Sequence, residues 1–417
     1  MTTPSWHDMT RVFGRIGVLS FGGPAAQIAL MHRELVETRC WLDEQTYLRA
    51  LSLCMLLPGP EAMQLATYAG WRLRGVPGGL LAGGLFVLPG ALIIAALVAL
   101  YVGFGAVPLV QAAFLGIKSA VIVIVLQALV KLSHRALKRP SAWVIAGLSF
   151  VAIFALDLPF PAIIAVAALW GFVTARPSET VEAPLPVRAQ PLKTAAIWLS
   201  LWLLPLAALS LWGAPLLADI GWFFAWLAVV SFGGAYALLG YMTQTVVQTY
   251  GWISTPQMID ALGLAETTPG PLILVTQFVA MLSGQLAGGA GLAFAAGVVA
   301  LWATFIPCFL WIFLAAPYLS RIAAQPRLSA ALQAISAAVV GVILNLSLWF
   351  AINVLFTRVT SSDGPGWLRL PLPDPATLVP ETLALTLLSG LLLLAARCDI
   401  AQTIALMALA GLLLGLV

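Results

Sequence analysis

Two short motifs rich in glycine and proline occur twice in this chain. Ser-Phe-Gly-Gly begins at Ser20 and again at Ser231, and Pro-Gly-Pro begins at Pro58 and again at Pro269. Both motifs return after the same step of 211 residues, which indicates an internal duplication.

Each Pro-Gly-Pro interrupts an apolar stretch and therefore predicts a broken helix. Proline lacks a backbone N–H, and its ring clashes with the preceding helical turn. The half-helix that begins after such a break presents N–H groups and a partial positive charge, which together attract an anion. Gly-Gly allows a ligand or another helix to approach closely. The candidate anion-binding residues of the four motifs are Ser20, Gly22, Gly23, Pro58, Gly59, Pro60, Ser231, Gly233, Gly234, Pro269, Gly270 and Pro271.

Both kinds of motif also have a purely structural interpretation. The proline pairs could kink helices for packing alone, and the small residues could let two membrane helices pack closely. Hydroxyl and amide side chains near the breaks are further candidate donors to a bound anion, namely Gln64, Thr67, Thr267 and Thr268.

Two charged residues add to the anion hypothesis. Lys118 lies about ten residues into an apolar run, so it is ~15 Å deep at 1.5 Å per residue. A cation at that depth is costly and marks a functional site unless it is paired or reaches the interface. Glu61 directly follows the first Pro-Gly-Pro, where it could stabilise the helix start, carry a coupling proton or pair with Lys118.

The composition predicts an all-α polytopic membrane protein. Of 417 residues, 61% are hydrophobic and only 9% are charged, and the mean hydropathy is +1.01. Soluble domains have about 25% charged residues. Apolar runs long enough for a bilayer recur, and they predict ten to thirteen transmembrane helices. One run covers 12–31 and another 217–241.

The predicted organisation is two homologous repeats joined by a linker. Residues 1–175 form the N-terminal repeat, 176–193 a cytoplasmic linker and 194–417 the C-terminal repeat. Beyond Pro-Gly-Pro the step between the copies becomes 218, as Pro89 and Pro307 show. At this step Lys118 corresponds to Ser336, so the intramembrane cation occurs once per chain.

The distribution of Lys and Arg predicts the orientation. With a cytoplasmic N-terminus and thirteen crossings, 14 of the 20 Lys and Arg residues fall in inside loops and four in outside loops. The second copy then begins on the opposite side from the first, and the repeats are inverted. Inverted repeats with broken helices are typical of secondary transporters, which bind substrate near the midplane.

The sequence lacks the motifs of several classes of protein. We find no P-loop for ATP and no metal-binding motif, and the four cysteines are scattered. We therefore expect no cofactor, no metal site, no catalytic residues and no nucleic-acid partner. A membrane enzyme is the alternative from a different class.

The motifs of the first copy resemble those of the chromate ion transporter family in its long, two-domain form. The similar stretches are Phe-Gly-Gly-Pro-Ala-Ala-Gln-Ile-Ala at 21–29, Trp-Leu-Asp-Glu-Gln at 41–45 and Leu-Leu-Pro-Gly-Pro-Glu-Ala at 56–62. Gly-Ile-Lys-Ser-Ala-Val at 116–121 is similar to a family motif that has proline in place of Ser119. Phe-Gly-Gly-Ala-Tyr and Thr-Pro-Gly-Pro-Leu in the second copy also fit the family's second domain.

The resemblance implies a multi-pass secondary transporter of the bacterial inner membrane that exports chromate and confers chromate resistance, with sulfate as the competing ion. The residues by themselves point to a tetrahedral dianion, and transport of sulfate or another oxyanion is the alternative. The sequence leaves the coupling ion open and is compatible with a homodimer in the lipid bilayer.

Overall fold

The computed structural model describes residues 4–105, 107–175, 190–232, 235–319, 325–361 and 371–415. These residues are helical almost throughout, and the described strands are β1 (Val359–Ser361) and β2 (Pro371–Pro373), which pair antiparallel. The fold confirms an all-α polytopic membrane protein. Most of the predicted linker, 176–189, lies outside the described residues.

The chain folds into two compact units, and each unit takes segments from both predicted repeats. Unit 1 combines Met1–Ala99, Arg176–Ala235 and Thr268–Ser329. Its elements are α1 (Trp6–Leu19), α2 (Gly23–His32), η1 (Arg33–Thr38), α3 (Glu44–Leu56), most of α4 (Glu61–Phe104), α8 (Pro191–Leu211), α9 (Pro215–Val230), η3 (Leu272–Leu274), α12 (Val275–Gly288), α13 (Ala290–Ala315) and η4 (Ala316–Tyr318).

Unit 2 combines Leu100–Ala175, Tyr236–Thr267 and Ala330–Val417. It holds the end of α4 together with α5 (Pro108–Ala136), α6 (Pro140–Phe154), α7 (Phe160–Thr174), α10 (Ala235–Gln244), η2 (Thr245–Thr249), α11 (Thr255–Glu266), α15 (Pro326–Leu355), β1, β2, η5 (Pro375–Thr377), α16 (Pro380–Gly390), η6 (Leu391–Ala395) and α17 (Ile400–Leu414).

The two copies share one order of elements. The order α1, α2, η1 and α3 in the first copy matches α9, α10, η2 and α11 in the second, and a Pro-Gly-Pro break follows in both. The long α4 has a non-helical bend at Arg74 and Gly75, and the second copy divides at Gly289 into α12 and α13. α5 then corresponds to α15.

The predicted breaks at Pro-Gly-Pro are confirmed, but the structure adds a second kind of break. The apolar run 12–31 is two helices, since α1 ends at Leu19 and α2 begins at Gly23. The run 217–241 divides in the same way between α9 and α10. Gly22 has φ of 85° and Gly23 of 80°, a left-handed backbone at the start of α2 that separates it from α1. Treating these two runs as uninterrupted helices was therefore wrong.

Among the described residues, five helices are long and apolar enough to cross a membrane: Glu61–Phe104, Pro108–Ala136, Pro191–Leu211, Ala290–Tyr318 and Pro326–Leu355. Shorter apolar helices, such as α9 and α12, lie beside them. The number of membrane crossings stays a prediction, because length and composition do not decide whether a broken or short helix crosses the membrane.

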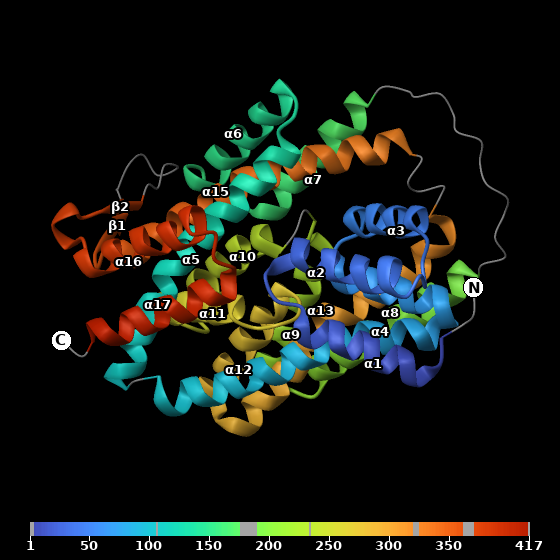
Figure 1. Cartoon of the computed structure of the whole chain (residues 1–417), viewed down its shortest axis with the longest axis horizontal. Coiled ribbons are helices and arrows are strands. Elements are labelled where there is room, and N and C mark those ends of the chain that lie inside the picture. Colours follow the sequence, from blue (N-terminus) through green and yellow to red (C-terminus); the bar gives the residue numbers. More distant parts are fainter. Residues whose placement is uncertain are drawn as a thin grey trace. The chain divides into compact units, whose positions relative to one another are not determined.

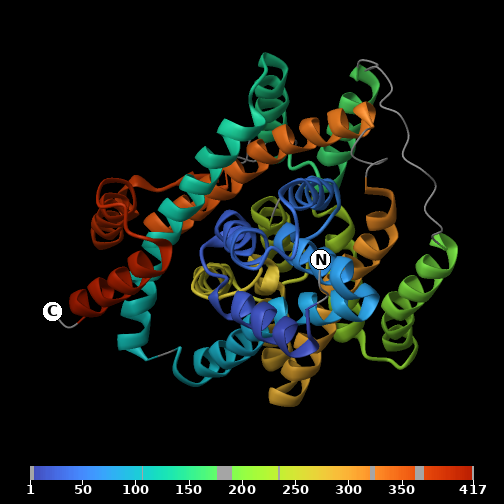
Figure 2. The same ribbon diagram turned by 45° about the vertical axis from the view of Figure 1, so that its right-hand side comes forward.

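Each unit is organised around one long helix. In unit 1, α13 packs against α8, α9 and α12, and the indole N–H of Trp202 donates to the carbonyl of Ala303 at 3.0 Å. In unit 2, α5 packs against α11, α16 and α17. Figures 1 and 2 show α17 lying along α5.

The α5–α17 contact depends on glycine. A Cβ on Gly116 would lie 1.8 Å from the carbonyl oxygen of Met407, and a Cβ on Gly411 would lie 2.2 Å from that of Ala112. The two helices therefore meet backbone to backbone, two residues before Lys118, and this contact fixes where Lys118 is held.

We predict that Gly116→Ala destabilises the protein, by about 1–3 kcal/mol, because α17 must move away from α5. The matched control is Gly147→Ala on α6, where no atom lies within 4 Å of the new Cβ. Thermal unfolding in detergent measures both variants. Equal unfolding temperatures for the two variants would contradict this packing.

Candidate functional site

The helix breaks of the two copies are joined by crossed backbone hydrogen bonds in unit 1. The carbonyl oxygen of Ser20 accepts from the N–H of Gly270 at 2.9 Å, and that of Ser231 accepts from the N–H of Gly59 at 3.0 Å. Each Ser-Phe-Gly-Gly break thus binds the Pro-Gly-Pro break of the other copy. The exchange is reciprocal, as it is between two parts related by a two-fold axis.

The local sequence explains why these groups are free to meet. The backbone of Ser20 has φ −78° and ψ 62°, and that of Ser231 has φ −79° and ψ 67°, so both helices end in the same conformation. Gly59 and Gly270 have φ of 119° and 89°, values that favour glycine. Proline on either side of each glycine prevents a continuous helix, and the glycine N–H turns to the other copy.

A second pair of contacts also joins each Pro-Gly-Pro break to the other copy. A Cβ on Gly90 of α4 would lie 2.3 Å from the carbonyl oxygen of Pro269, so α4 runs directly over the second break. A Cβ on Gly59 would lie 3.0 Å from the sulfur of Cys308, so α13 covers the first break. Gly90 and Cys308 correspond at the step of 218 residues.

Gln27 fastens the crossing on one side. Its amide nitrogen Nε2 donates to the carbonyl oxygen of Gly270 at 2.7 Å and to that of Ser20 at 3.1 Å, and the residue is 2% exposed. The sequence analysis did not predict this role. A polar residue four positions after Gly23 in an apolar helix was the available signal. The corresponding residue of the second copy is Leu238, so the crossing is not fully symmetric.

Two further buried glutamines follow the breaks. The Nε2 atom of Gln64 donates to the carbonyl oxygen of Pro58 at 2.6 Å, and that of Gln277 to Ala91 at 3.0 Å. Their Oε1 atoms are buried without a hydrogen-bond partner among the described residues. They are acceptors that a water or a protonated ligand would satisfy.

The hydroxyl donors near the breaks are used within their own helices. Ser20 donates to Ile16 at 2.6 Å and Ser231 to Ala228 at 2.9 Å. Thr67 and Thr267 also donate to carbonyl groups of their own helices. In this conformation these hydroxyls do not donate to an anion.

The remaining motif residues stay candidates for different reasons. The helices that follow Pro60 and Pro271 begin at Glu61 and Leu272, as predicted, and Glu61 is half-buried. Gly233 and Gly234 lie outside the described residues.

Lys118 is held in an ion pair that the sequence analysis missed. Its Nζ lies 2.7 Å from Oδ1 of Asp260 on α11, and the hydroxyl of Tyr101 donates to Oδ2 of the same carboxylate at 2.8 Å. The side chain of Lys118 is 23% exposed and that of Asp260 10%. All three residues belong to unit 2. An acidic residue inside the apolar run 256–286 was the signal available in the sequence.

The sequence model of the chromate transporter family matches residues 7–172 and residues 218–416. The chain belongs to the chromate transporter family. It is 33% identical over 348 residues to a chromate transport protein of Cupriavidus metallidurans, covering 82% of both chains. It is 32% identical to a probable chromate transport protein of Synechococcus elongatus, over 81% of this chain and 83% of the relative.

A chromate transport protein of Pseudomonas aeruginosa is also similar, at 31% identity over 81% of this chain and 79% of the relative. No solved structure matches the chain. The family match and the long apolar helices together establish a multi-pass membrane protein.

A second carboxyl group of this transporter-family chain is partly buried and lies close to the second break in sequence. Glu266 ends α11, three residues before Pro269, and its carboxyl group shares a hydrogen bond with the hydroxyl of Tyr236. At the step of 211 residues these positions hold Met55 and Ala25 in the first copy. The two copies therefore differ in chemistry although their backbones share one order of elements.

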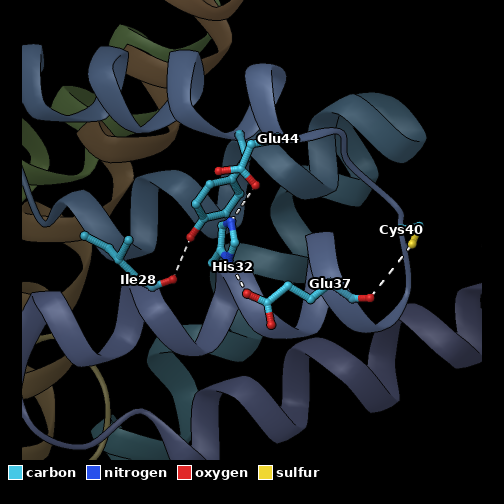
Figure 3. A network of polar contacts seen from close by, with 6 residues as sticks. Ile28, His32, Glu37, Cys40 and Glu44 are labelled. Atoms are coloured by element: carbon cyan, nitrogen blue, oxygen red, sulfur yellow. Dashed lines mark hydrogen bonds and ion pairs between the residues drawn. The ribbon is translucent and has the colours of Figure 1, made fainter.

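A charged network shapes the hairpin between α2 and α3 in unit 1. Both ring nitrogens of His32 bond to carboxylates, Nδ1 to Glu37 at 3.0 Å and Nε2 to Glu44 at 2.7 Å (Figure 3). The ring of Tyr47 packs edge-on against that of His32, and its hydroxyl donates to the carbonyl of Ile28 at 2.6 Å. The hydrogen bond with Glu44, followed by the charge of Glu44 and the bond with Glu37, raises the pKa of His32. Two carboxylate partners require a proton on both nitrogens.

We predict that Gln27→Met destabilises unit 1 by about 1–3 kcal/mol, because the buried carbonyl of Gly270 loses its donor. Gln111→Met is the matched control, since that exposed amide also donates to a carbonyl, that of Gly105, where water can replace it. Thermal unfolding in detergent compares the two. An unchanged unfolding temperature for Gln27→Met would show that the amide does not fasten the crossing.

We predict that the α2–α3 hairpin loosens as pH rises. A raised histidine pKa means that the stabilisation is complete below the ordinary pKa of about 6.5 and is lost as pH passes the raised value. Hydrogen exchange of residues 33–44, measured from pH 6 to pH 9, should therefore accelerate beyond its intrinsic pH dependence. His32→Gln should abolish this excess, whereas His134→Gln on α5 should keep it. An excess that survives His32→Gln would assign it to another group.

Proposed function

We propose that this protein is a secondary transporter that exports chromate across the inner membrane of a bacterium. The crossed helix breaks are the observation that carries the proposal, because irregular backbone at membrane depth is tolerated only where it is buried or lines a cavity. The relatives named as chromate transport proteins support chromate as the ion. A transport role makes the protein a carrier and not an enzyme.

The proposed mechanism is alternating access between inverted repeats, with the N-terminus in the cytoplasm. The reciprocal bonds of Ser20 with Gly270 and of Ser231 with Gly59 support a pseudo-two-fold relation. In transporters built from inverted repeats, the substrate binds near the membrane midplane where the repeats meet. The prolines on both sides of each glycine leave the breaks as the points where the backbone can adjust.

The anion-binding groups we propose are backbone N–H groups and one cation. The N-termini after Pro60 and Pro271 carry the positive end of a helix dipole into a buried environment. Gly22 and Gly23 leave the backbone uncovered, whereas the N–H groups of Gly59 and Gly270 become available to an anion only when their bonds to Ser231 and Ser20 open. Lys118 is the cation that we propose for the oxyanion.

Membrane potential alone favours export. A potential of 100 mV, negative inside, contributes ~2.3 kcal/mol per charge, so roughly 4.6 kcal/mol for a dianion. Proton coupling through Glu61 could add to the driving force, but the membrane potential already favours export without it. Sulfate is the second candidate substrate, because helix N–H groups and an ammonium group recognise a tetrahedral dianion whatever its central atom. A homodimer is compatible with the proposal.

The direct test is uptake of chromate into everted membrane vesicles, with and without energisation and with excess sulfate. We expect energised uptake of chromate that sulfate inhibits. Sulfate uptake without chromate uptake would show that sulfate is the transported ion, and the proposed anion site would remain. No flux of either ion would refute the proposal.

We predict that Lys118→Gln lowers the initial rate of chromate uptake by more than about tenfold, or ~1.4 kcal/mol, with the protein still present in the membrane. Lys131→Gln is the control, since Lys131 lies exposed on the same helix. Wild-type uptake by Lys118→Gln at equal protein levels would remove Lys118 from the site.

A further inference from the structure

We propose that Asp260 is an internal counter-anion that occupies Lys118 in the empty transporter and must leave before the oxyanion binds. This inference rests on the proposed function. It assigns a role in the transport cycle to Asp260 and to Tyr101, two residues that the motifs do not include.

The geometry divides the carboxylate between two donors. Oδ1 of Asp260 faces the ammonium group of Lys118 at 2.7 Å, and Oδ2 accepts from the hydroxyl of Tyr101 at 2.8 Å. Asp260 is 8% exposed and lies on α11, the helix that leads into the second break. α11 packs directly on α5, which carries Lys118.

The pairing has an energetic consequence for the empty transporter. A lone cation at the centre of a membrane helix is costly. The carboxylate of Asp260 neutralises Lys118 and lowers that cost. The same contact prevents Lys118 from attracting another anion, so an oxyanion and Asp260 compete for one ammonium group.

The duplication argues against a purely structural role for the pair. At the corresponding positions of the other copy, Lys118 becomes Ser336, Asp260 becomes Arg49 and Tyr101 becomes Leu319. A packing element common to both copies would keep opposite charges at both places. The ion pair of Lys118 and Asp260 therefore occurs at these positions of one copy only. A site for one charged substrate per chain needs only one such pair.

The groups that face Asp260 are Lys118 from α5 and Tyr101 from the end of α4. An oxyanion that binds the ammonium group of Lys118 displaces Oδ1 of Asp260 from it. The hydroxyl of Tyr101 opposes this displacement, because it holds the carboxylate beside Lys118.

The transport cycle separates two kinds of flux. Net export requires the empty transporter to return, and a neutral Lys118–Asp260 pair makes that return inexpensive. Exchange of external for internal oxyanion requires only the loaded transporter to move. Loss of Asp260 should therefore stop net export while exchange continues.

The experiment uses the full chain reconstituted in proteoliposomes with radiolabelled chromate. For Asp260→Asn we expect net efflux to fall more than about tenfold, exchange to stay within about twofold of wild type, and the Kd for chromate to fall about tenfold, or ~1.4 kcal/mol. Asp219→Asn, at an exposed aspartate of α9, is the control and should resemble wild type.

A second variant covers the case in which Asp260→Asn does not fold, since breaking a buried ion pair is often destabilising. Tyr101→Phe keeps the pair and should lower the Kd for chromate by about threefold, because the carboxylate loses the hydrogen bond that holds it beside Lys118. Wild-type affinity and net efflux in Asp260→Asn, or an unchanged Kd in Tyr101→Phe, would overturn the inference. Failure of the wild-type protein to move any oxyanion would instead overturn the proposed function.

Discussion

A broken helix inside a membrane exposes backbone N–H and carbonyl groups that need hydrogen-bond partners, and the rest of this structure depends on how those partners are supplied. A bilayer offers no water to these groups, so each one must bond within the protein. Here the carbonyls of Ser20 and Ser231 meet the glycine N–H groups of the opposite Pro-Gly-Pro motifs. Gln27, Gly90 and Cys308 complete the crossing. Each copy therefore supplies partners for the break of the other.

Much of this arrangement could be predicted from the sequence, because the relevant signals are local. The step of 211 residues indicated the duplication, and Pro-Gly-Pro indicated the helix ends at Leu56 and Glu61. The break at Gly22 was missed, because Ser-Phe-Gly-Gly lies within a run that is apolar throughout. A hydropathy window does not register a left-handed backbone.

The partners of the charged and amide groups could not be predicted in the same way. Lys118 was recognisable from its depth. Its distance of 2.7 Å from Asp260, however, depends on how α5 packs on α11, two helices that lie far apart in the sequence. Gln27 likewise became informative only when Gly270 was found beside it. Depth and composition are properties of one segment, whereas pairing is a property of two. The copies consequently share a backbone plan and differ in the groups placed on it.

If the two copies are inverted in the membrane, matched positions of the copies are accessible from opposite sides. Thr38 and Thr249 are exposed, end η1 and η2, and correspond at the step of 211 residues. Thr38→Cys and Thr249→Cys would each be labelled, in a chain without its four native cysteines, by a membrane-impermeant maleimide applied to intact cells and to everted vesicles. Inverted copies predict that Thr38→Cys and Thr249→Cys are labelled from opposite sides of the membrane. Labelling of both from the same side would contradict the account.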